Sequence, residues 1–373
     1  MSRRAGRRRP PLPLVLAAGL IVCLLLLPLG YLVIRVGSGG GRALDLLWDQ
    51  ETLALVLRTV LLVAGVVTAT VVVAVPLAWL VVRTDLPGRR AWATAAALPL
   101  VIPSYVAALC LLSFFGEKGL LQQALGVERL PDPTGYWGAL TALTLSTYPY
   151  VFLLTQAALR DLDPGQEEAA RSLGASRGRV LFRVTLPSVR PAVSLGALLV
   201  GLYTLSDFGV VSLMRYDALT RAIYLQYRSL FDRTPAAVLA LVLVALTAVA
   251  LAVELRVRTR GQVYRTSPGA ARRARPVALG RWRIPALAWC TVVVGLFLAE
   301  AAAIGLLGGA LGAAGGAALA RAISASVFGA PIALRPAALP LAIAAALVIT
   351  LAGSALPARR IAGLRPAEVL RGR

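Results

Sequence analysis

The chain has 373 residues, of which 58% are hydrophobic and 15% are charged, and its mean hydropathy is +0.76. Soluble domains average about 45–50% apolar and about 25% charged residues, so this composition argues strongly against a soluble globular enzyme and excludes a disordered chain. Lysine and arginine outnumber aspartate and glutamate by 39 to 17. Because the arginines lie between apolar runs, membrane topology explains this excess better than nucleic-acid binding does.

Residue types that commonly perform chemistry are scarce. The chain has no histidine, so the commonest metal ligand and the commonest general base are missing. Its three cysteines, Cys23, Cys110 and Cys290, lie far apart within apolar runs and form no Cys-x-x-Cys pair. We therefore expect no catalytic residue, no metal site, no disulfide and no cofactor, and we interpret the cysteines as buried thiols.

Long apolar runs predict an all-α, polytopic transmembrane helical bundle. A helix needs about 20 apolar residues to cross a bilayer, and backbone groups in lipid must form their hydrogen bonds within their own segment. Six runs meet this length: 12–34, 59–82, 92–115, 137–158, 191–213 and 236–255. Three later runs predict two or three C-terminal helices: 285–299, 301–320 and 337–356.

The distribution of arginine gives the expected orientation in the membrane. Arginines crowd the first nine residues and the segments 83–91, 159–190 and 256–284, the last of which has nine arginines and no acid. The alternate loops, at 37–58, 116–136 and 214–235, mix both signs. By the positive-inside rule the N-terminus is cytoplasmic. The first apolar run is too long for a signal peptide, so we expect a retained span.

The segment 159–190, called here the 159–190 loop, is polar and rich in helix signals. Asp163 suits an N-cap before Pro164, and Gly174 suits the left-handed end of the first short helix. Ser176 can then cap a second short helix, which we expect Pro187 to end.

The spacing within this loop resembles the EAA loop of type I ABC importer permeases. The pattern of that family is Glu-Ala-Ala, three residues, glycine, nine residues, an aliphatic residue, any residue, and Leu-Pro. The matching residues are Glu168, Ala169, Ala170, Gly174, Val184, Leu186 and Pro187. The runs LPLVIPSYV (98–106), TYPYVFLL (147–154) and TLSDFGVV (204–211) resemble the ferric-iron subgroup of these permeases.

The resemblance implies a permease domain over residues 1–297, with 256–284 as a basic cytoplasmic linker. A periplasmic or lipid-anchored binding protein would deliver a small substrate, expected to be ferric iron, and a separate ATPase would dock on the 159–190 loop. Glu168 could then pair with a basic group of the ATPase, small side chains at Ala169 and Ala170 would allow close approach, and Gly174 would set the angle between the short helices. A second permease copy, as a homodimer or a related chain, and membrane lipid are the other expected partners, and nucleic acid is not.

No phosphate-binding loop is present in the sequence. The motif G-x-x-x-x-G-K-[ST] needs a lysine, and the only lysine, Lys118, lacks the matching upstream glycine. ATP would therefore be hydrolysed by the partner subunit, and we expect this chain to be a transport subunit and not an enzyme.

Polar groups within the apolar runs are candidates for a translocation path. Asp207 is costly in hydrocarbon and should face a cavity or a partner; it is either a pathway residue or the acceptor of a structural hydrogen bond. Tyr105 and Tyr148 could line the path or simply pack. Pro99, Pro103 and Pro149 are expected to kink the third and fourth spans.

The tail, residues 298–373, has a different character. It combines overlapping Gly-x-x-x-Gly pairs within 300–320 with the ending SALPARRIAGLRPAEVLRGR (354–373), and it resembles the C-terminus of FtsX-like permeases. A second EAA loop is absent from the sequence. If all three late runs crossed the membrane, the last arginines would lie outside, so we expect 285–299 to merge with the next run or to lie at the interface.

These observations predict a multi-pass protein of the bacterial inner membrane, and they explain the tail by a fusion of two unrelated permease fragments, either natural or an artefact of sequence assembly. The alternatives are an FtsX-like exporter or mechanotransmission permease, which the tail favours, and a non-functional fused or truncated fragment. A polytopic membrane enzyme is a further alternative, which the missing histidine and the missing pair of catalytic groups in the spans disfavour.

Overall fold

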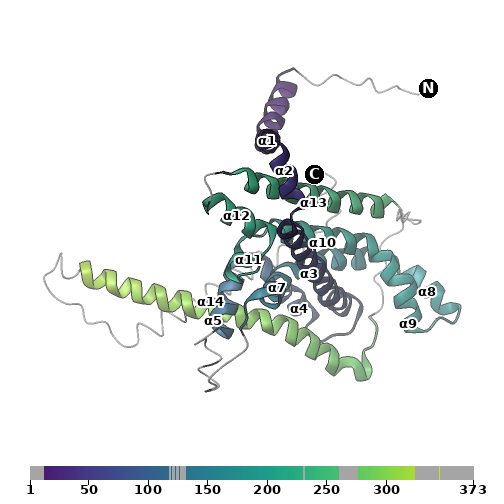
Figure 1. The fold of residues 1–373 in the computed structure, drawn as a ribbon. Coiled ribbons are helices and arrows are strands. Elements are labelled where there is room, and N and C mark those ends of the chain that lie inside the picture. Colours follow the sequence, from purple (N-terminus) through teal and green to yellow (C-terminus); the bar gives the residue numbers. More distant parts are fainter. Residues whose placement is uncertain are drawn as a thin grey trace, which may run out of the picture. The chain divides into compact units, whose positions relative to one another are not determined.

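Helices make up most of the part of the protein that the structure describes. The computed structural model describes residues 12–116, 132–229, 232–259 and 276–323, together with the single residues 119, 122, 126 and 344. Within these ranges no β-strand occurs, and the only bridge of β type joins Thr84 to Val277 (Figure 1). The predicted all-α class is confirmed.

Helices of very different length follow one another along the chain. They are α1 (Leu12–Ser38), α2 (Gly40–Trp48), α3 (Gln50–Arg83), α4 (Arg89–Ala95), the 3-10 turn η1 (Leu98–Val101), α5 (Ser104–Phe115), α7 (Gly135–Asp161), α8 (Pro164–Ser172), α9 (Arg177–Val180), the π-helical stretch η2 (Leu181–Thr185), α10 (Leu186–Ser206), α11 (Gly209–Leu213), α12 (Leu219–Ser229), α13 (Thr234–Thr259), the 3-10 turn η3 (Gly280–Trp282) and α14 (Arg283–Ile323).

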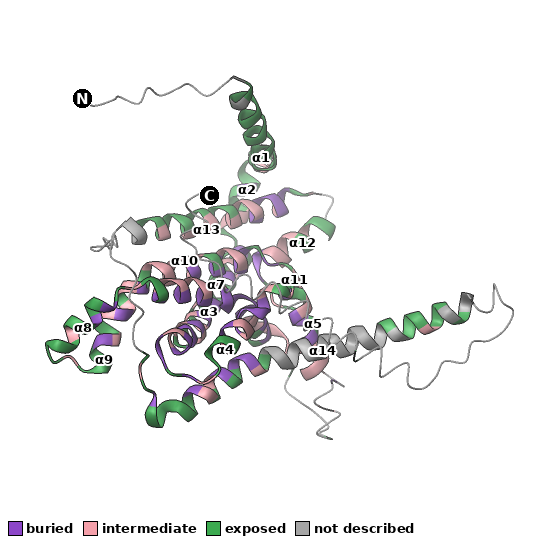
Figure 2. Ribbon diagram, turned by 180° about the vertical axis from the view of Figure 1, so that it is seen from behind, coloured by how far each residue is buried: buried purple, intermediate pink, exposed green. Residues whose placement is uncertain are grey.

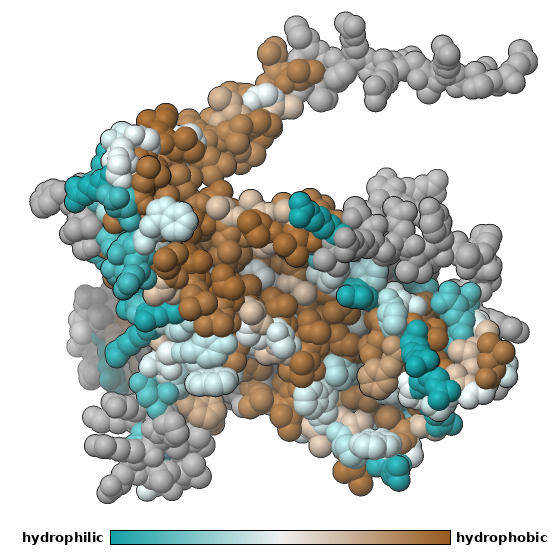
Figure 3. All heavy atoms as spheres, turned by 45° about the vertical axis from the view of Figure 1, so that its right-hand side comes forward, coloured by the Kyte–Doolittle hydropathy of each residue, from teal (hydrophilic) through white to brown (hydrophobic). Residues whose placement is uncertain are grey.

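Among the residues that the structure describes, four helical segments are long and apolar enough to cross a membrane, and a bent pair of helices could supply a fifth. The four segments are Val15–Ser38, Gln50–Arg83, Arg177–Ser206 and Thr234–Arg256. Large apolar side chains of α1 such as Leu25 and Ile34 are exposed, and Figure 3 shows apolar side chains covering much of the face in view. Such exposure is unfavourable in water and suits contact with lipid.

Two of the six predicted spans are broken in the structure. The run 92–115 is divided into Arg89–Val101 and Ser104–Phe115, which meet at 98°. Pro103 disfavours a helical conformation at Ile102, whose backbone is extended (φ −96°, ψ 124°). The run 191–213 is broken after Ser206, where Asp207 is also extended, and resumes as the short helix α11.

The predicted span 137–158 forms most of α7, but α7 is not among the four apolar segments. It has 27 residues, and many of its threonines and serines are buried. The hydroxyls of Ser146 and Thr147 donate to backbone oxygens one turn earlier, at 2.9 and 2.6 Å. α7 is therefore an inner helix: some of its hydroxyls bond to its own backbone, whereas those of Thr144 and Thr155 are buried without a hydrogen-bond partner among the described residues.

The described residues divide into two compact units. One contains residues 1–59 and 217–248, and its core is formed by Leu55, Leu219 and Leu239. The other contains 60–216 and 249–373 and holds α7, α10 and α5, whose buried residues are coloured purple on the ribbon in Figure 2. Within this second unit a Cβ atom on Gly196 of α10 would lie 2.8 Å from the Cα of Val151, so α10 packs on α7 with almost no space between the backbones.

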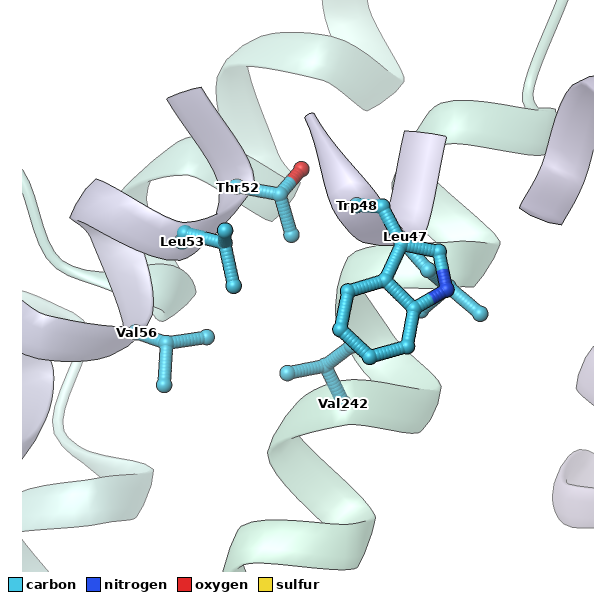
Figure 4. A pocket seen from close by; sticks show the side chains of 6 residues that line it. All are labelled: Leu47, Trp48, Thr52, Leu53, Val56 and Val242. Carbon is cyan, nitrogen blue, oxygen red and sulfur yellow. The ribbon is translucent and has the colours of Figure 1, made fainter. Parts of the chain in front are cut away.

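The first unit contains an apolar cavity of about 280 Å³ between α2, α3 and α13. Figure 4 shows the indole of Trp48 facing Leu53 and Val56 of α3, with Val242 of α13 between them. Thr52 supplies the only side-chain hydroxyl among its lining residues. A lining of this kind offers no group for acid–base or metal chemistry.

The late apolar runs 285–299 and 301–320 form one helix. α14 is continuous for 41 residues and crosses the predicted domain boundary at 297/298 without a break. The predicted merging of the two runs is thus confirmed, while the boundary itself stays a prediction. The run 337–356, apart from residue 344, and the ending 354–373 lie outside the described residues.

The three cysteines are free thiols, and they differ in burial. Cys110 and Cys290 are buried, as predicted, whereas Cys23 is exposed on α1. That part of the prediction was wrong because an apolar neighbourhood along the chain does not bury a residue on a helix that faces lipid. Among the described residues no group of three or more metal-ligating side chains comes together.

Candidate functional site

The first half of the 159–190 loop folds as the sequence predicts. Asp163 caps α8 by accepting a hydrogen bond from the N–H of Gly165 at 2.9 Å. At the other end Gly174 has a left-handed backbone (φ 81°). Its N–H donates to the carbonyl of Arg171 at 2.9 Å, and the N–H of Ala175 donates to the carbonyl of Ala170 at 3.1 Å. This pair of bonds is the Schellman arrangement, in which glycine at the turning position avoids backbone strain.

The second half departs from the prediction. Ser176 caps α9 as expected, through the N–H of Arg179 at 3.4 Å, but Pro187 does not end the helix. The chain stays helical from Arg177 to Ser206 through the π-helical stretch Leu181–Thr185. Here the N–H of Leu186 bonds to the carbonyl of Leu181, one residue farther back than in an α-helix. Since Pro187 is the second residue of α10, its missing N–H falls where a new helical register begins.

A buried carboxylate, Glu167, fixes the loop to the end of α3. Its Oε1 accepts from Nη2 of Arg83 at 3.0 Å and from the hydroxyl of Thr185 at 2.8 Å. Its Oε2 accepts from Nη2 of Arg171, one turn along α8, at 3.2 Å. Glu167 is 6% exposed, and a buried charge is stable only when it is paired and hydrogen-bonded. The three partners come from α3, α8 and η2, so one side chain joins all three elements.

Sequence reasoning selected Glu168 and missed Glu167. The only local signal for Glu167 was its spacing of four residues from Arg171, which allows an ion pair along a helix. Its strongest partner, Arg83, is 84 positions away in the sequence and was counted only as a topological charge. Nothing in the sequence alone joins these two residues.

The residues of the Glu-Ala-Ala pattern differ from Glu167 in being exposed or half-buried. Glu168, Ala169, Gly174 and Pro187 are exposed, and Ala170, Val184 and Leu186 are half-buried. Two large apolar side chains stand out beside them: Leu173 is 88% exposed and Phe182 is 69% exposed. The loop therefore combines a fixed inner side with an outer side that carries small, acidic and apolar groups.

The chain returns to this place much later in the sequence. The N–H of Val277 donates to the carbonyl of Arg83 at 2.8 Å, and the N–H of Asp85 donates to the carbonyl of Val277 at 3.2 Å. A carboxylate oxygen of Asp85 accepts from the N–H of Leu279 at 2.9 Å. Residues 276–279, called here the strap, belong to the predicted basic linker and lead through η3 into α14.

Both carboxylate oxygens of Asp207 accept hydrogen bonds within the protein, which favours a structural role. It is 9% exposed; Oδ2 accepts from the hydroxyl of Ser104 at 2.8 Å and Oδ1 from the N–H of Val210 at 2.8 Å. The carboxylate thus caps α11 and ties it to the start of α5. Tyr105 is close by, because a Cβ atom on Gly209 would lie 2.8 Å from the Cβ of Tyr105. Tyr148 is fully buried on α7, whereas Tyr105 is exposed, and a translocation path through these residues stays a prediction.

The model of the family "binding-protein-dependent transport system inner membrane component" matches residues 70–260, which include the whole 159–190 loop. The chain belongs to this family. It is therefore a multi-pass component of the inner membrane. A second family model, "FtsX-like permease C-terminal", matches residues 292–366, so the resemblance of the tail to that family is also confirmed.

Curated relatives of this inner membrane component are transport permeases by name. It is 30% identical over 266 residues to the Fe(3+)-transport system permease protein FbpB 2 of Haemophilus influenzae, covering 71% of this chain and 50% of that protein. It is 32% identical to the sulfate transport system permease protein CysT of Salmonella typhimurium, covering 52% of this chain and 70% of the relative. It is 36% identical to the molybdenum transport system permease protein ModB of Escherichia coli K12, covering 35% and 58%. The chain thus spans about half the length of the iron permease.

A solved structure confirms the fold of the inner membrane component. A chain of a bacterial alginate ABC transporter, crystallised in complex with an alginate-bound periplasmic protein, superposes with a TM-score of 0.50. The match covers 67% of this chain and 94% of that chain at 16% sequence identity. At this identity the likeness concerns the fold alone.

Proposed function

We propose that the chain is the transmembrane permease subunit of an ABC importer and that a separate ATPase docks on the 159–190 loop. The observation that carries this proposal is the two-sided loop. Glu167 joins it to α3 through Arg83, while Glu168, Ala169 and Gly174 remain exposed on the opposite side. A docking element needs both properties, because motion of a partner is transmitted only if the contact surface is rigidly joined to the spans.

The continuous helical stretch Arg177–Ser206 can carry motion of the 159–190 loop into the membrane-spanning helices. Because the chain is helical from Arg177 to Ser206, a displacement of the loop is passed directly to α10, which packs against α7 at Gly196. In the proposed mechanism, closing of the ATPase tilts α10 and α7 between inward-open and outward-open arrangements. Glu168 pairs with a basic group of the ATPase, and the exposed Leu173 and Phe182 supply apolar contact.

Ferric iron is the substrate that we propose, delivered by an external binding protein. Sequence phrases at 98–106, 147–154 and 204–211 support it, as does the iron permease among the relatives. Sulfate and molybdenum permeases are also among the relatives, so these anions are the rival substrates. Uptake of labelled ferric iron, sulfate and molybdate into vesicles, each with its own binding protein, distinguishes them, and uptake of either anion without iron uptake would contradict the iron assignment.

Co-purification with a candidate ABC ATPase subunit tests the docking proposal. Glu168→Arg should abolish substrate-stimulated ATP hydrolysis and uptake while leaving membrane insertion unchanged, because it reverses the charge on the docking side only. Asp161→Arg is the matched control: Asp161 is an exposed acid in the same loop but outside the Glu-Ala-Ala pattern. Equal losses in both variants, or normal transport with Glu168→Arg, would contradict the proposal.

An FtsX-like exporter or mechanotransmission permease is the second candidate. The specific observation in its favour is the family match over 292–366, which begins inside α14. Removal of residues 324–373 tests it: under the importer proposal uptake persists, whereas loss of uptake with an intact 159–190 loop and normal insertion would favour a function that depends on the tail.

A further inference from the structure

A cavity of about 430 Å³ lies where the 159–190 loop, the end of α3 and the strap meet. All its lining residues belong to the same compact unit. Its lining contains four charged side chains: Arg83, Glu167, Arg171 and Arg177. Trp79, Val180, Leu181 and the strap supply the apolar part of the wall.

The charges around the cavity are not balanced. Three guanidinium groups face one carboxylate, and both oxygens of Glu167 are already occupied by Arg83, Arg171 and Thr185. Within the described part of the chain the guanidinium group of Arg177 forms no hydrogen bond or ion pair, and Nε of Arg83 is buried without a hydrogen-bond partner. A partly enclosed excess of positive charge attracts an anion, and guanidinium groups match the oxygens of a phosphate.

The cavity is bordered by the ends of two candidate spans, so we expect it near the lipid headgroups. Arg83 is the last residue of one candidate span and Arg177 is the first residue of another. α3 has 34 residues, so at about 1.5 Å per residue it is longer than the roughly 30 Å of hydrocarbon, and its end reaches the headgroup region. Trp79 is one turn inward from Arg83, and tryptophan is enriched at this depth of the membrane.

We propose that this cavity binds a phosphate group, supplied by the headgroup of an anionic phospholipid. The phosphate lies between Arg177, Arg171 and Arg83, and the start of the acyl chains contacts Trp79 and Leu181. Free inorganic phosphate offers the same chemistry without the apolar contacts, and it is the other source that must be tested. A bound lipid would join the strap and the loop to the membrane surface. This inference does not depend on the proposed transport function.

Quenching of tryptophan fluorescence by brominated lipid tests the proposal on the full chain. The purified protein is placed in phosphatidylcholine nanodiscs that contain a minority of either brominated phosphatidylglycerol or brominated phosphatidylcholine. The difference between the unsubstituted protein and Trp79→Phe isolates the signal of Trp79. We expect this signal to be quenched more strongly by the brominated phosphatidylglycerol. Since one arginine near a membrane surface contributes about 1 kcal/mol, Arg177→Gln should lower the apparent affinity for the anionic lipid about fivefold.

Arg89→Gln is the matched control, because Arg89 is an exposed arginine beyond the same end of α3 that does not line the cavity. An equal loss with Arg89→Gln would mean diffuse attraction to the membrane surface and would overturn the proposal. A second arm adds inorganic phosphate to pure phosphatidylcholine discs and records thermal unfolding. Stabilisation that Arg177→Gln removes, without a preference for phosphatidylglycerol, would assign free phosphate and overturn the lipid source. If Arg177→Gln changes the result in neither arm, the phosphate site itself is overturned.

Discussion

Glu167 and Glu168 are adjacent in α8, yet their environments are opposite. Successive positions on an α-helix are about 100° apart, so one carboxylate faces Arg83 and Thr185 while the other faces outward. The buried one is held by three donors and therefore has a structural role. The exposed one is available to a partner. A substitution at each position should consequently have a different kind of effect.

Glu167→Ala should destabilise the protein strongly. Removing one member of a buried ion pair leaves the other charge uncompensated, which costs about 3–5 kcal/mol in the free energy of unfolding. Thermal unfolding in detergent measures this loss. Glu168→Ala should unfold close to the temperature of the unsubstituted protein, and similar unfolding temperatures for the two variants would contradict the assignment of Glu167 as the anchor.

Gly174→Val should strain the turn between α8 and α9. The left-handed conformation at φ 81° costs an L-residue roughly 1–2 kcal/mol, and a β-branched side chain is among the least tolerant of it. We expect lower ATP-coupled uptake with normal insertion. Gly178→Ala, in the neighbouring helix with no atom near its added Cβ, is the control that should keep uptake. Full uptake by Gly174→Val would show that the turn does not set the loop geometry.

The contact of α10 with α7 determines how the loop can move the spans. A helix can transmit a displacement only if it is continuous, and the π-helical stretch keeps the chain helical across Pro187. It can act on its neighbour only if the two are tightly packed, which the close approach of Gly196 to Val151 provides. Continuity and close packing together make the loop and these two helices one mechanical element.

Gly196→Ala should disturb this packing. Its Cβ would lie 2.8 Å from a backbone atom that cannot move aside, and overpacking of this kind costs about 1–3 kcal/mol. Gly201→Ala is the matched control on the same helix, because its Cβ would lie 3.7 Å from Val63 and Val67, an ordinary contact. The unfolding temperatures of the two variants check the prediction, and an equal shift in both would refute it.

The sequence predicted the helices and a kink at Pro103, but it did not predict the interruption at Asp207. Apolar runs indicate helices because lipid leaves the backbone no other hydrogen-bond partners. The breaks at 102–103 and 207–208 depend instead on Pro103 and on the hydrogen bond of Asp207 with Ser104, and the latter partner comes from a different helix. The sequence pattern also identified the exposed residues of the 159–190 loop. The ion pair of Glu167 with Arg83, in contrast, is a long-range contact that no local spacing encodes.

The topology of the whole molecule can be tested by cysteine accessibility. In a variant with the three native cysteines replaced by alanine, Glu168→Cys should react with a membrane-impermeant maleimide only after the cytoplasmic side is opened. Asp45→Cys, in the loop predicted to be external, should react in intact cells. The reverse pattern would invert the predicted orientation and remove the ATPase from reach of the 159–190 loop.

The strap has a consequence for how such a chain can change over evolution. Because Val277 is hydrogen-bonded to Arg83 and Asp85, the stretch of chain between residues 85 and 277 begins and ends at the same place. The residues after 279 therefore start from this hydrogen-bonded site. Because the start of α14 keeps its packing on α5, sequence added farther along can vary without altering the residues before it, which gives a physical reason why a segment that matches FtsX-like permeases can follow one that matches the inner membrane component in a single polypeptide.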